Sequence, residues 1–467
     1  MKQFILSLSI LLIGFTAKSD NKLKGHGRHM IVNEWYPNGT TFTVTPDNGI
    51  VNIQLENTFI NFNDEDDRAP CIDIKEGNQV RIILKGDNFL QGGSCCPAIR
   101  VHPGSELFID GYSEGNGSLG RLVARGGNMV VHTVNIGTNF GSETRSLPGG
   151  AGIGGGWDYI DYKNPPKEYE DKTFNVFKFV PGLWNPFANN EDIPDEYKYH
   201  ERESFWTQGY GGCGKIHING AIVEAYGGGK WAPGIGPAGL FAQGGQIVVQ
   251  LGSQVYAKGG ENAPGIGCSD YSRVHEIKVA DGNTRVVAEG GDGAPGIGGG
   301  VGQLQRNCRI DAINLAGGYI VAKAGNPEND GMRTPPAIGA MGWGETPSFN
   351  FINGVVDVSD GGINASPETV TYRGGNVIVH NTNTAMNFPD RRVSNKLATV
   401  VFTDPDITTS EGLTFKVGDN DYVHPGVTGG EDRRLTDDKK MQLHLTSDQT
   451  GKVTVYENGL LRYEETA

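Results

Sequence analysis

Three carboxylates lie shortly after copies of one glycine-rich phrase. Asp158 is five residues beyond the isoleucine of its copy, Asp270 is four beyond and Glu345 is seven beyond. Two carboxylates roughly 6.5–9.5 Å apart, with a water between them, can hydrolyse a glycosidic bond. Arg273 could neutralise a uronate carboxylate, as a polysaccharide lyase requires. The three offsets differ and surface loops often carry acids, so a catalytic pair is one hypothesis among several.

Aromatic side chains gather around the same phrase. Five of the six tryptophans lie in the segment that follows its first copy, or beside later copies. Aromatic rings stack on sugar rings, and Trp and Tyr give a large rigid contact area, so these residues are candidates for ligand binding. The alternative is a small core that holds the inserted segment against the rest of the fold. The candidates are Trp157, Tyr159, Trp184, Trp206, Trp231 and Trp343.

The phrase that positions these residues is a structural repeat. It reads Ala-Pro-Gly-Ile-Gly from Ala232, Ala263 and Ala294, so its isoleucines are 31 residues apart. A longer glycine-rich copy begins at Gly150 and a degenerate one ends at Gly339. A fixed period of about 20–50 residues is typical of solenoids, propellers and arrays.

Short alternating runs separate the copies, for example Lys215-Ile216-His217-Ile218 and Gln246-Ile247-Val248-Val249. They have the period of a β-strand, and the glycines around them leave no room for an amphipathic helix. Three short strands and three corners fit one repeat, whereas a propeller blade needs about 40 residues or more. We therefore predict an all-β, right-handed parallel β-helix with an interior ladder of isoleucines. An array of β-sandwiches is the alternative.

The coil is expected over residues 69–365, with an inserted, aromatic-rich loop region at 157–208. Residues 18–68 are predicted to form N-terminal capping strands, because a solenoid must cover the apolar stack at its ends. Residues 366–467 are predicted to form a β-rich C-terminal cap or small module. Within it, Asn458-Gly459 between two strand-like runs indicates a hairpin.

At the glycine-rich phrases from Gly150 and Ala232, the chain resembles a loosely defined group of secreted and cell-surface proteins with Ala-Gly-Ile-Gly-Gly coils. Many of these proteins are described as carbohydrate-binding domain-containing. The resemblance covers residues 65–365 and implies a β-helix and a bias toward contact with glycans. It transfers no catalytic residue.

Residues 1–17 have the features of a secretory signal peptide, with Lys2 before a short apolar run and small residues before the expected cleavage site. No later segment resembles a membrane span. We expect a secreted or cell-surface protein, with the periplasm as a further location. Six cysteines in an exported chain suggest disulfides, although fifteen pairings leave their connectivity open.

A net charge of −14 disfavours nucleic acid and anionic membrane surfaces as partners. It also makes a densely charged glycan a less natural ligand, unless a local basic groove or a cation intervenes. The cysteines and histidines do not group as zinc ligands do, so we expect no metal and no cofactor. Calcium at the acidic run Asp64-Glu65-Asp66-Asp67 is the one alternative, but the run lacks EF-hand spacing and a solvated loop explains it.

The sequence therefore supports three functions. The first is binding of a neutral or weakly charged polysaccharide or cell-surface glycan along one face. The second is cleavage of such a polymer by loop carboxylates, as a glycoside hydrolase or polysaccharide lyase. The third is a structural matrix or surface protein without a site. One fold hosts many activities, so whether the chain is an enzyme stays undecided at this stage.

Overall fold

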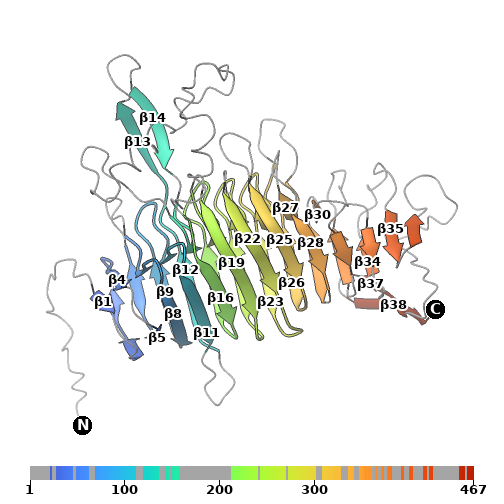
Figure 1. The fold of residues 1–467 in the computed structure, drawn as a ribbon, viewed down its shortest axis with the longest axis horizontal. Helices are drawn as coiled ribbons and strands as arrows, with labels where there is room; N and C mark the ends of the chain where they lie inside the picture. Colours follow the sequence, from blue (N-terminus) through green and yellow to red (C-terminus); the bar gives the residue numbers. More distant parts are fainter. Residues whose placement is uncertain are drawn as a thin grey trace, which may run out of the picture.

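Three sheets of parallel strands stack along one long axis, from the N-terminal to the C-terminal end (Figure 1). Apart from the antiparallel pairs β13–β14, β35–β36 and β37–β38, consecutive strands of the chain belong to different sheets, so the chain coils as a parallel β-helix, as predicted. The right-handed sense follows the general rule for parallel crossovers and stays a prediction. The computed structural model describes residues 21–23, 28–45, 49–62, 69–111, 119–135, 142–147, 149–156, 212–239, 242–269, 272–300, 308–327, 335–340, 347–352 and 354–359, and after them a series of separate strands.

Sheet A contains the shortest strands, and five of the ten carry the isoleucine of the repeated phrase. The phrases are in register, since Ile235 pairs with Ile266 and Ile266 pairs with Ile297. In order, its strands are β1 (Asn21–Leu23), β4 (Phe42–Val44), β7 (Ile72–Ile74), β10 (Ile99–Val101), β15 (Ile153–Gly154), β18 (Ile235–Gly236), β21 (Ile266–Cys268), β24 (Ile297–Gly299), β27 (Ile338–Ala340) and β30 (Ile363–Asn364).

Sheet B contains the longest strands, which are the alternating runs of the sequence. Every other side chain points into the coil, as in the buried–intermediate alternation of β8. Its strands are β2 (Arg28–Val32), β5 (Ile50–Glu56), β8 (Gln79–Lys85), β11 (Glu106–Gly111), β16 (Lys215–Asn219), β19 (Gln243–Gln250), β22 (Arg273–Val279), β25 (Arg309–Leu315), β28 (Ser348–Phe351), β31 (Val370–Tyr372), β33 (Arg391–Val393), β35 (Thr414–Val417) and the antiparallel β36 (Asn420–Val423).

Sheet C completes each turn, and three of its strands share the pattern Val-x-Ala. Val255 and Ala257 pair with Val286 and Ala288 of the next turn, and all four are buried. Its strands are β3 (Trp35–Tyr36), β6 (Phe59–Asn61), β9 (Asp87–Gln91), β12 (Arg121–Arg125), β17 (Ile222–Tyr226), β20 (Gln254–Lys258), β23 (Arg285–Glu289), β26 (Tyr319–Lys323), β29 (Val355–Ser359), β32 (Asn376–His380) and β34 (Thr399–Phe402).

Two antiparallel hairpins lie outside the three sheets. The first pairs β13 (Val130–Asn135) with β14 (Ser142–Leu147) and projects from the coil between β12 and β15 (Figure 1). The second pairs β37 (Lys452–Glu457) with β38 (Leu460–Thr466), which confirms the hairpin predicted around residues 458–459.

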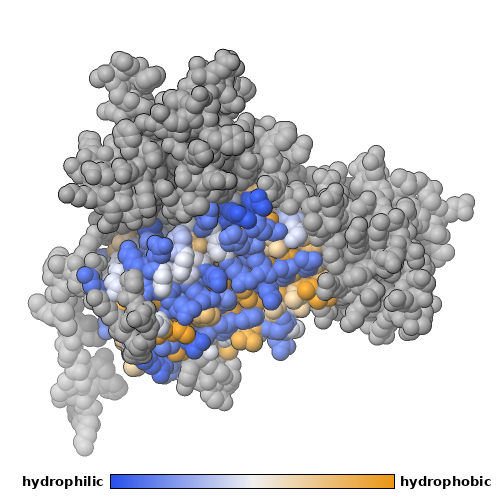
Figure 2. Space-filling model, in the orientation of Figure 1, coloured by the Kyte–Doolittle hydropathy of each residue, from blue (hydrophilic) through white to orange (hydrophobic). Residues whose placement is uncertain are grey.

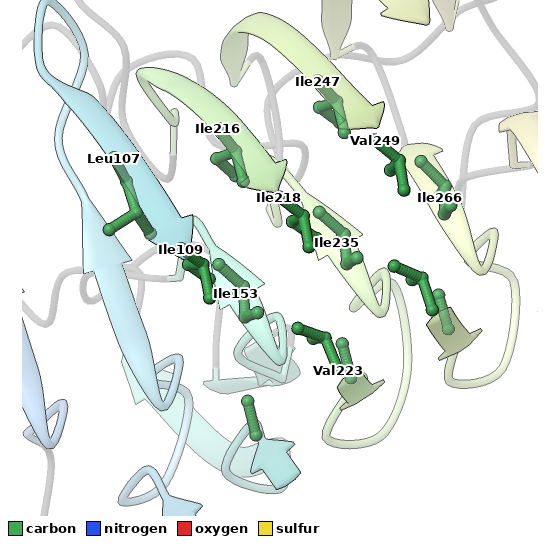
Figure 3. Close-up of a cluster of buried hydrophobic side chains, with 14 of the residues drawn as sticks. Leu107, Ile109, Ile153, Ile216, Ile218, Val223, Ile235, Ile247, Val249 and Ile266 are labelled. Carbon is green, nitrogen blue, oxygen red and sulfur yellow. The ribbon is translucent and has the colours of Figure 1, made fainter. Parts of the chain in front are cut away.

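The core is a set of apolar ladders that run along the axis. Leu107, Ile216 and Ile247 occupy equivalent places on three successive strands of sheet B (Figure 3). Ile153 and Ile235 form the matching ladder of sheet A, and all five side chains are fully buried. Replacing such a residue by alanine typically costs about 2–5 kcal/mol, so each turn contributes its own share of the stability.

Glycine is required at the second position of the five sheet A strands that carry the repeated phrase. Gly236, Gly267 and Gly298 have φ angles of 139°, 142° and 142°, a region that essentially only glycine adopts. A Cβ atom on Gly267 would lie 1.8 Å from the main-chain oxygen of Gly298. The glycine after each isoleucine therefore allows the turns to stack at sheet A.

The coil extends beyond the limits expected from the phrase. Residues 18–68 were expected to be capping strands, but β1 to β6 pair in parallel with the later strands of all three sheets. They are turns of the coil itself. After residue 365, the strands β31, β32, β33 and β34 likewise continue sheets B and C.

The cysteines correct another expectation. All six are buried free thiols, so the structure contains none of the predicted disulfides. Burial raises the pKa of the Cys71 thiol, and it raises that of Cys213 to about 12. A thiol that stays protonated is a poor nucleophile and metal ligand. These cysteines act as small apolar residues of the core.

Candidate functional site

The corner that leads into a strand of sheet A and the corner that leads out of the next one lie close together, because the sheet A strands are only two or three residues long. The Ser269 hydroxyl, just after β21, donates a 2.6 Å hydrogen bond to the main-chain oxygen of Trp231, just before β18. The Ser272 amide then donates to the Ser269 carbonyl at 3.0 Å, which closes a tight turn into Arg273. Trp231 and Arg273, two predicted site residues, therefore lie at one edge on neighbouring turns. We call it the A–B edge.

Trp231 has an unusual backbone for a large residue. Its φ angle is 57°, in the left-handed region, where a residue other than glycine pays about 1–2 kcal/mol. The equivalent residues of the next two turns are Asn262, with φ of 62°, and Gly293, with φ of 75°. The residue at this corner therefore adopts the left-handed conformation in all three turns. In the next two turns it is asparagine or glycine, the residue types that tolerate this conformation. The indole is half-buried, and none of the described residues accepts a hydrogen bond from its buried Nε1.

Arg273 belongs to a charged cluster on the outer face of sheet B. Its Nη2 donates to Oδ2 of Asp311 at 2.6 Å, and its Nε lies 3.1 Å from each carboxylate oxygen. Arg309 donates from Nε to the same carboxylate at 2.7 Å. His275 Nδ1 lies 3.0 Å from Asp311 Oδ2. We call these four residues the Asp311 cluster.

Three carboxylates on the outer faces are held as anions. Partial burial raises the pKa of Asp311, Glu224 and Glu289, but hydrogen bonds and nearby cations lower each pKa by more. The net effect is a pKa below the ordinary value in all three. The main donors are Arg273 for Asp311, Arg121 for Glu224 and Lys323 for Glu289. A general acid needs the opposite shift, so these carboxylates suit ion pairing and binding.

Most of the residues predicted for the site lie outside the described part of the chain. The signal peptide 1–17, the acidic run at 64–67 and most of the inserted region are also outside it. The predicted site residues concerned are Trp157, Asp158, Tyr159, Trp184, Trp206, Asp270, Trp343 and Glu345.

Sheet C carries an aromatic column that the sequence analysis missed. Trp35 stacks on Phe59 with ring centroids 4.0 Å apart, and Phe59 stacks on Phe89 at 5.0 Å, with interplanar angles of 11° and 14°. The Arg125 guanidinium continues the column, 5.8 Å from the Phe89 centroid and 4.9 Å from that of Tyr226. The ring faces cover one another, so the column chiefly stabilises the stacked turns.

The sequence contains the aromatic residues of this column, but they lie in three separate segments of the chain. Phe59 and Phe89 occupy outward positions, next to the buried apolar residues Ile60 and Leu90. Only the parallel register of β3, β6 and β9 brings the rings together. Trp35 is 67% exposed and is the first ring of the column.

The described surface that faces the viewer in Figure 2 shows no extended apolar face. In the orientation of Figure 2, the described residues are mostly hydrophilic, with smaller hydrophobic areas along the lower side of the coil and at one end. None of the described elements is a helix with the length and hydropathy of a membrane span. Within the same residues, no three His, Cys, Asp or Glu side chains converge as metal ligands would.

Searches against family models, curated proteins and solved structures find no match to this chain. Any argument about function therefore depends on the geometry of the described residues.

Proposed function

We propose that the chain is an exported protein that binds a polysaccharide along the A–B edge without cleaving it. The ligand is a neutral or weakly charged polymer of the cell surface or its surroundings. The observation that carries the proposal is Trp231, a large aromatic residue in a left-handed conformation whose main-chain oxygen accepts a hydrogen bond from Ser269, four residues before Arg273. Backbone strain of this kind clusters at functional sites.

The repeat of the coil suits a linear polymer. Equivalent residues of successive turns are spaced about 4.8 Å apart along the axis. The segments 157–211, 270–271, 301–307 and 341–346 all join a strand of sheet A to the next strand of sheet B, so all of them start at the A–B edge. Insertions in solenoids often lie on the binding face. Tryptophan and tyrosine in these segments would extend the contact that Trp231 begins.

Among the described carboxylates with a shifted pKa, none is suited to be the general acid of a hydrolase. Hydrolysis requires one carboxylic acid that keeps its proton near neutral pH. Asp311, Glu224 and Glu289 are instead shifted toward the ionised form. Ionised carboxylates on a rigid sheet are well suited to accept hydrogen bonds from sugar hydroxyls, and guanidinium groups are well suited to donate hydrogen bonds to them.

The test compares wild type with Trp231→Gly. Glycine suits the left-handed backbone, and the strain relieved offsets the lost contact of the half-buried indole, so we expect a change in stability within about 1 kcal/mol. Retention on the bound polysaccharide should fall at least several-fold, measured by co-sedimentation against a panel of plant, algal, fungal and animal polymers. Asn262→Gly is the matched control, because it changes the equivalent corner without removing a ring.

Each outcome has a clear meaning. Equal retention of wild type and Trp231→Gly would remove Trp231 from the site. Release of reducing ends from a polymer would identify a hydrolase, and reducing ends together with unsaturated uronates would identify a lyase. Failure to retain or cleave any polymer would favour the structural matrix protein.

A further inference from the structure

The aromatic column of sheet C extends further than its first three rings. It takes one planar side chain from each of six consecutive strands, β3 to β20 in the order of the sheet. Neighbouring members are 4.0–5.8 Å apart, measured between ring centroids or from the guanidinium carbon of its one charged member. In order, the members are Trp35, Phe59, Phe89, Arg125, Tyr226 and Tyr256.

Arg125 is held in this column by the faces of its guanidinium group. The guanidinium carbon lies 5.8 Å from the ring centroid of Phe89 and 4.9 Å from that of Tyr226, on the strands to either side. The N–H donors lie in the guanidinium plane, so stacking on the rings leaves them unused. Among the described residues, none accepts a hydrogen bond from this group or forms an ion pair with it, and the side chain is exposed. Arg125 therefore presents a set of oriented, unused donors to solvent.

The carboxylate of Glu224 lies close enough to interact with the charge of Arg125, but it bonds to other groups. Its Oε1 accepts hydrogen bonds from Nη2 and Nε of Arg121 at 2.6 Å and 3.0 Å. Its Oε2 accepts one from the Tyr226 hydroxyl at 2.9 Å. These bonds also fix the Tyr226 ring, which is one of the two rings that hold Arg125. The guanidinium is therefore oriented before any ligand arrives, and its donors stay available.

A carboxylate attached to a sugar ring matches this arrangement. A planar guanidinium can donate two parallel hydrogen bonds to the two oxygens of a carboxylate. The rings on either side exclude water from the faces of the guanidinium, which strengthens such a bond, and aromatic side chains also pack well against sugar rings. The net charge of −14 favours a ligand with isolated carboxylates over a densely charged one. A uronic acid unit in a largely neutral glycan has all of these properties.

We propose that Arg125, between Phe89 and Tyr226, forms a second binding site, which takes the carboxylate of a uronic acid unit. The site is on the outer face of sheet C, whereas the A–B edge joins the other two sheets. It therefore goes beyond the polysaccharide contact proposed at Trp231 and does not depend on it. The guanidinium donates to the carboxylate oxygens, and the two rings contact the sugar.

The experiment uses the full chain and short oligosaccharides that each carry a single uronic acid, which is glucuronic, galacturonic or mannuronic acid. Each oligosaccharide is compared with its methyl ester, which keeps the sugar ring and removes the charge. Dissociation constants are measured by isothermal titration calorimetry. Wild type should bind at least one of the acids about tenfold more tightly than its ester, as expected for a charge-assisted hydrogen bond.

Two variants of Arg125 separate the charge from the geometry. Arg125→Gln should remove the preference for the acid. Arg125→Lys keeps the positive charge but loses the planar fork of donors, so it should lose most of the preference. Arg285→Gln is the matched control, because Arg285 is also exposed on the outer face of sheet C but lies over a single ring, that of Tyr319, at 5.5 Å. It should change the preference less than twofold.

The outcomes separate this site from the one at the A–B edge. No binding, or equal binding of acid and ester for every oligosaccharide, would overturn the site on sheet C. Equal losses in Arg125→Gln and Arg285→Gln would overturn its location, and a full preference in Arg125→Lys would overturn the role of the planar guanidinium. Tighter binding of a short oligoglutamate than of any uronate would overturn the assignment to a glycan. Trp231→Gly should leave the preference for the acid unchanged, so failure of one site is seen independently of the other.

Discussion

At the scale of single residues, charged side chains on the outer faces are paired before any ligand is present. Asp73 is the most buried example. Its Oδ1 lies 2.9 Å from His102 Nε2 and its Oδ2 lies 2.6 Å from Lys75 Nζ. Burial raises the pKa of Asp73. The hydrogen bond with His102 and the charges of Arg100 and Lys75 lower it by more, so the net pKa is about 2. The ionised carboxylate therefore stabilises the first turns of the coil.

This shift predicts a pH dependence. The folded-state pKa of Asp73 is below its ordinary value of 3.8, so its contribution to stability is complete above about pH 4 and is lost as the pH falls toward 2. Asp73→Asn should lower the free energy of unfolding by about 2 kcal/mol at pH 7 and much less at pH 2. Urea unfolding of both proteins at the two pH values measures the difference. A penalty of equal size at both values would show that the charge of Asp73 does not contribute.

At the scale of strands and corners, the glycine of the repeated phrase sets how closely the turns stack at sheet A. Gly267→Ala would place a Cβ 1.8 Å from a main-chain oxygen and would also force alanine into a region that it avoids. We expect a loss of about 2 kcal/mol or more in the free energy of unfolding, measured by chemical denaturation.

Gly282→Ala is the matched control for that substitution. No heavy atom lies within 4 Å of a Cβ at this position, so we expect a change within about 0.5 kcal/mol. Similar losses in the two variants would mean that the stacking at sheet A tolerates a side chain.

The repeat was predictable from the sequence where the glycine phrase is intact. The spacing of Ile235, Ile266 and Ile297 gave the coil and its register, because identical turns must stack identically. The first turns were assigned to a cap because the strand of Phe42 has no such phrase and only its pairing with Ile72 reveals it.

The candidate site was predictable only in part. Trp231 and Arg273 were found because they lie close to copies of the phrase. The contact between Arg273 and Asp311 joins residues 38 positions apart on neighbouring strands, and their outward directions depend on the register of sheet B. Sequence alone could not pair them.

At the scale of the whole molecule, the thiols lead to one further prediction. All six cysteines are free and buried, so stability does not depend on disulfides. The melting temperature of the purified chain should change by less than about 1 °C when a reductant is added, because a native disulfide would be worth roughly 2–5 kcal/mol. A clear fall in the melting temperature would show that cysteines pair after export. Mass measurement after thiol alkylation in denaturant provides an independent count of free thiols.

The equivalent corners at Trp231, Asn262 and Gly293 make the turns of this part of the coil interchangeable units. Each turn begins and ends in the same backbone conformation, so one 31-residue unit can be removed or duplicated without altering the residues on either side of the junction. In a solenoid each unit contacts mainly its neighbours, so such a change adjusts the length by about 4.8 Å and leaves the remaining turns as they were. Gene duplication would thus lengthen the coil one turn at a time, while the residue at each corner changes independently of the others.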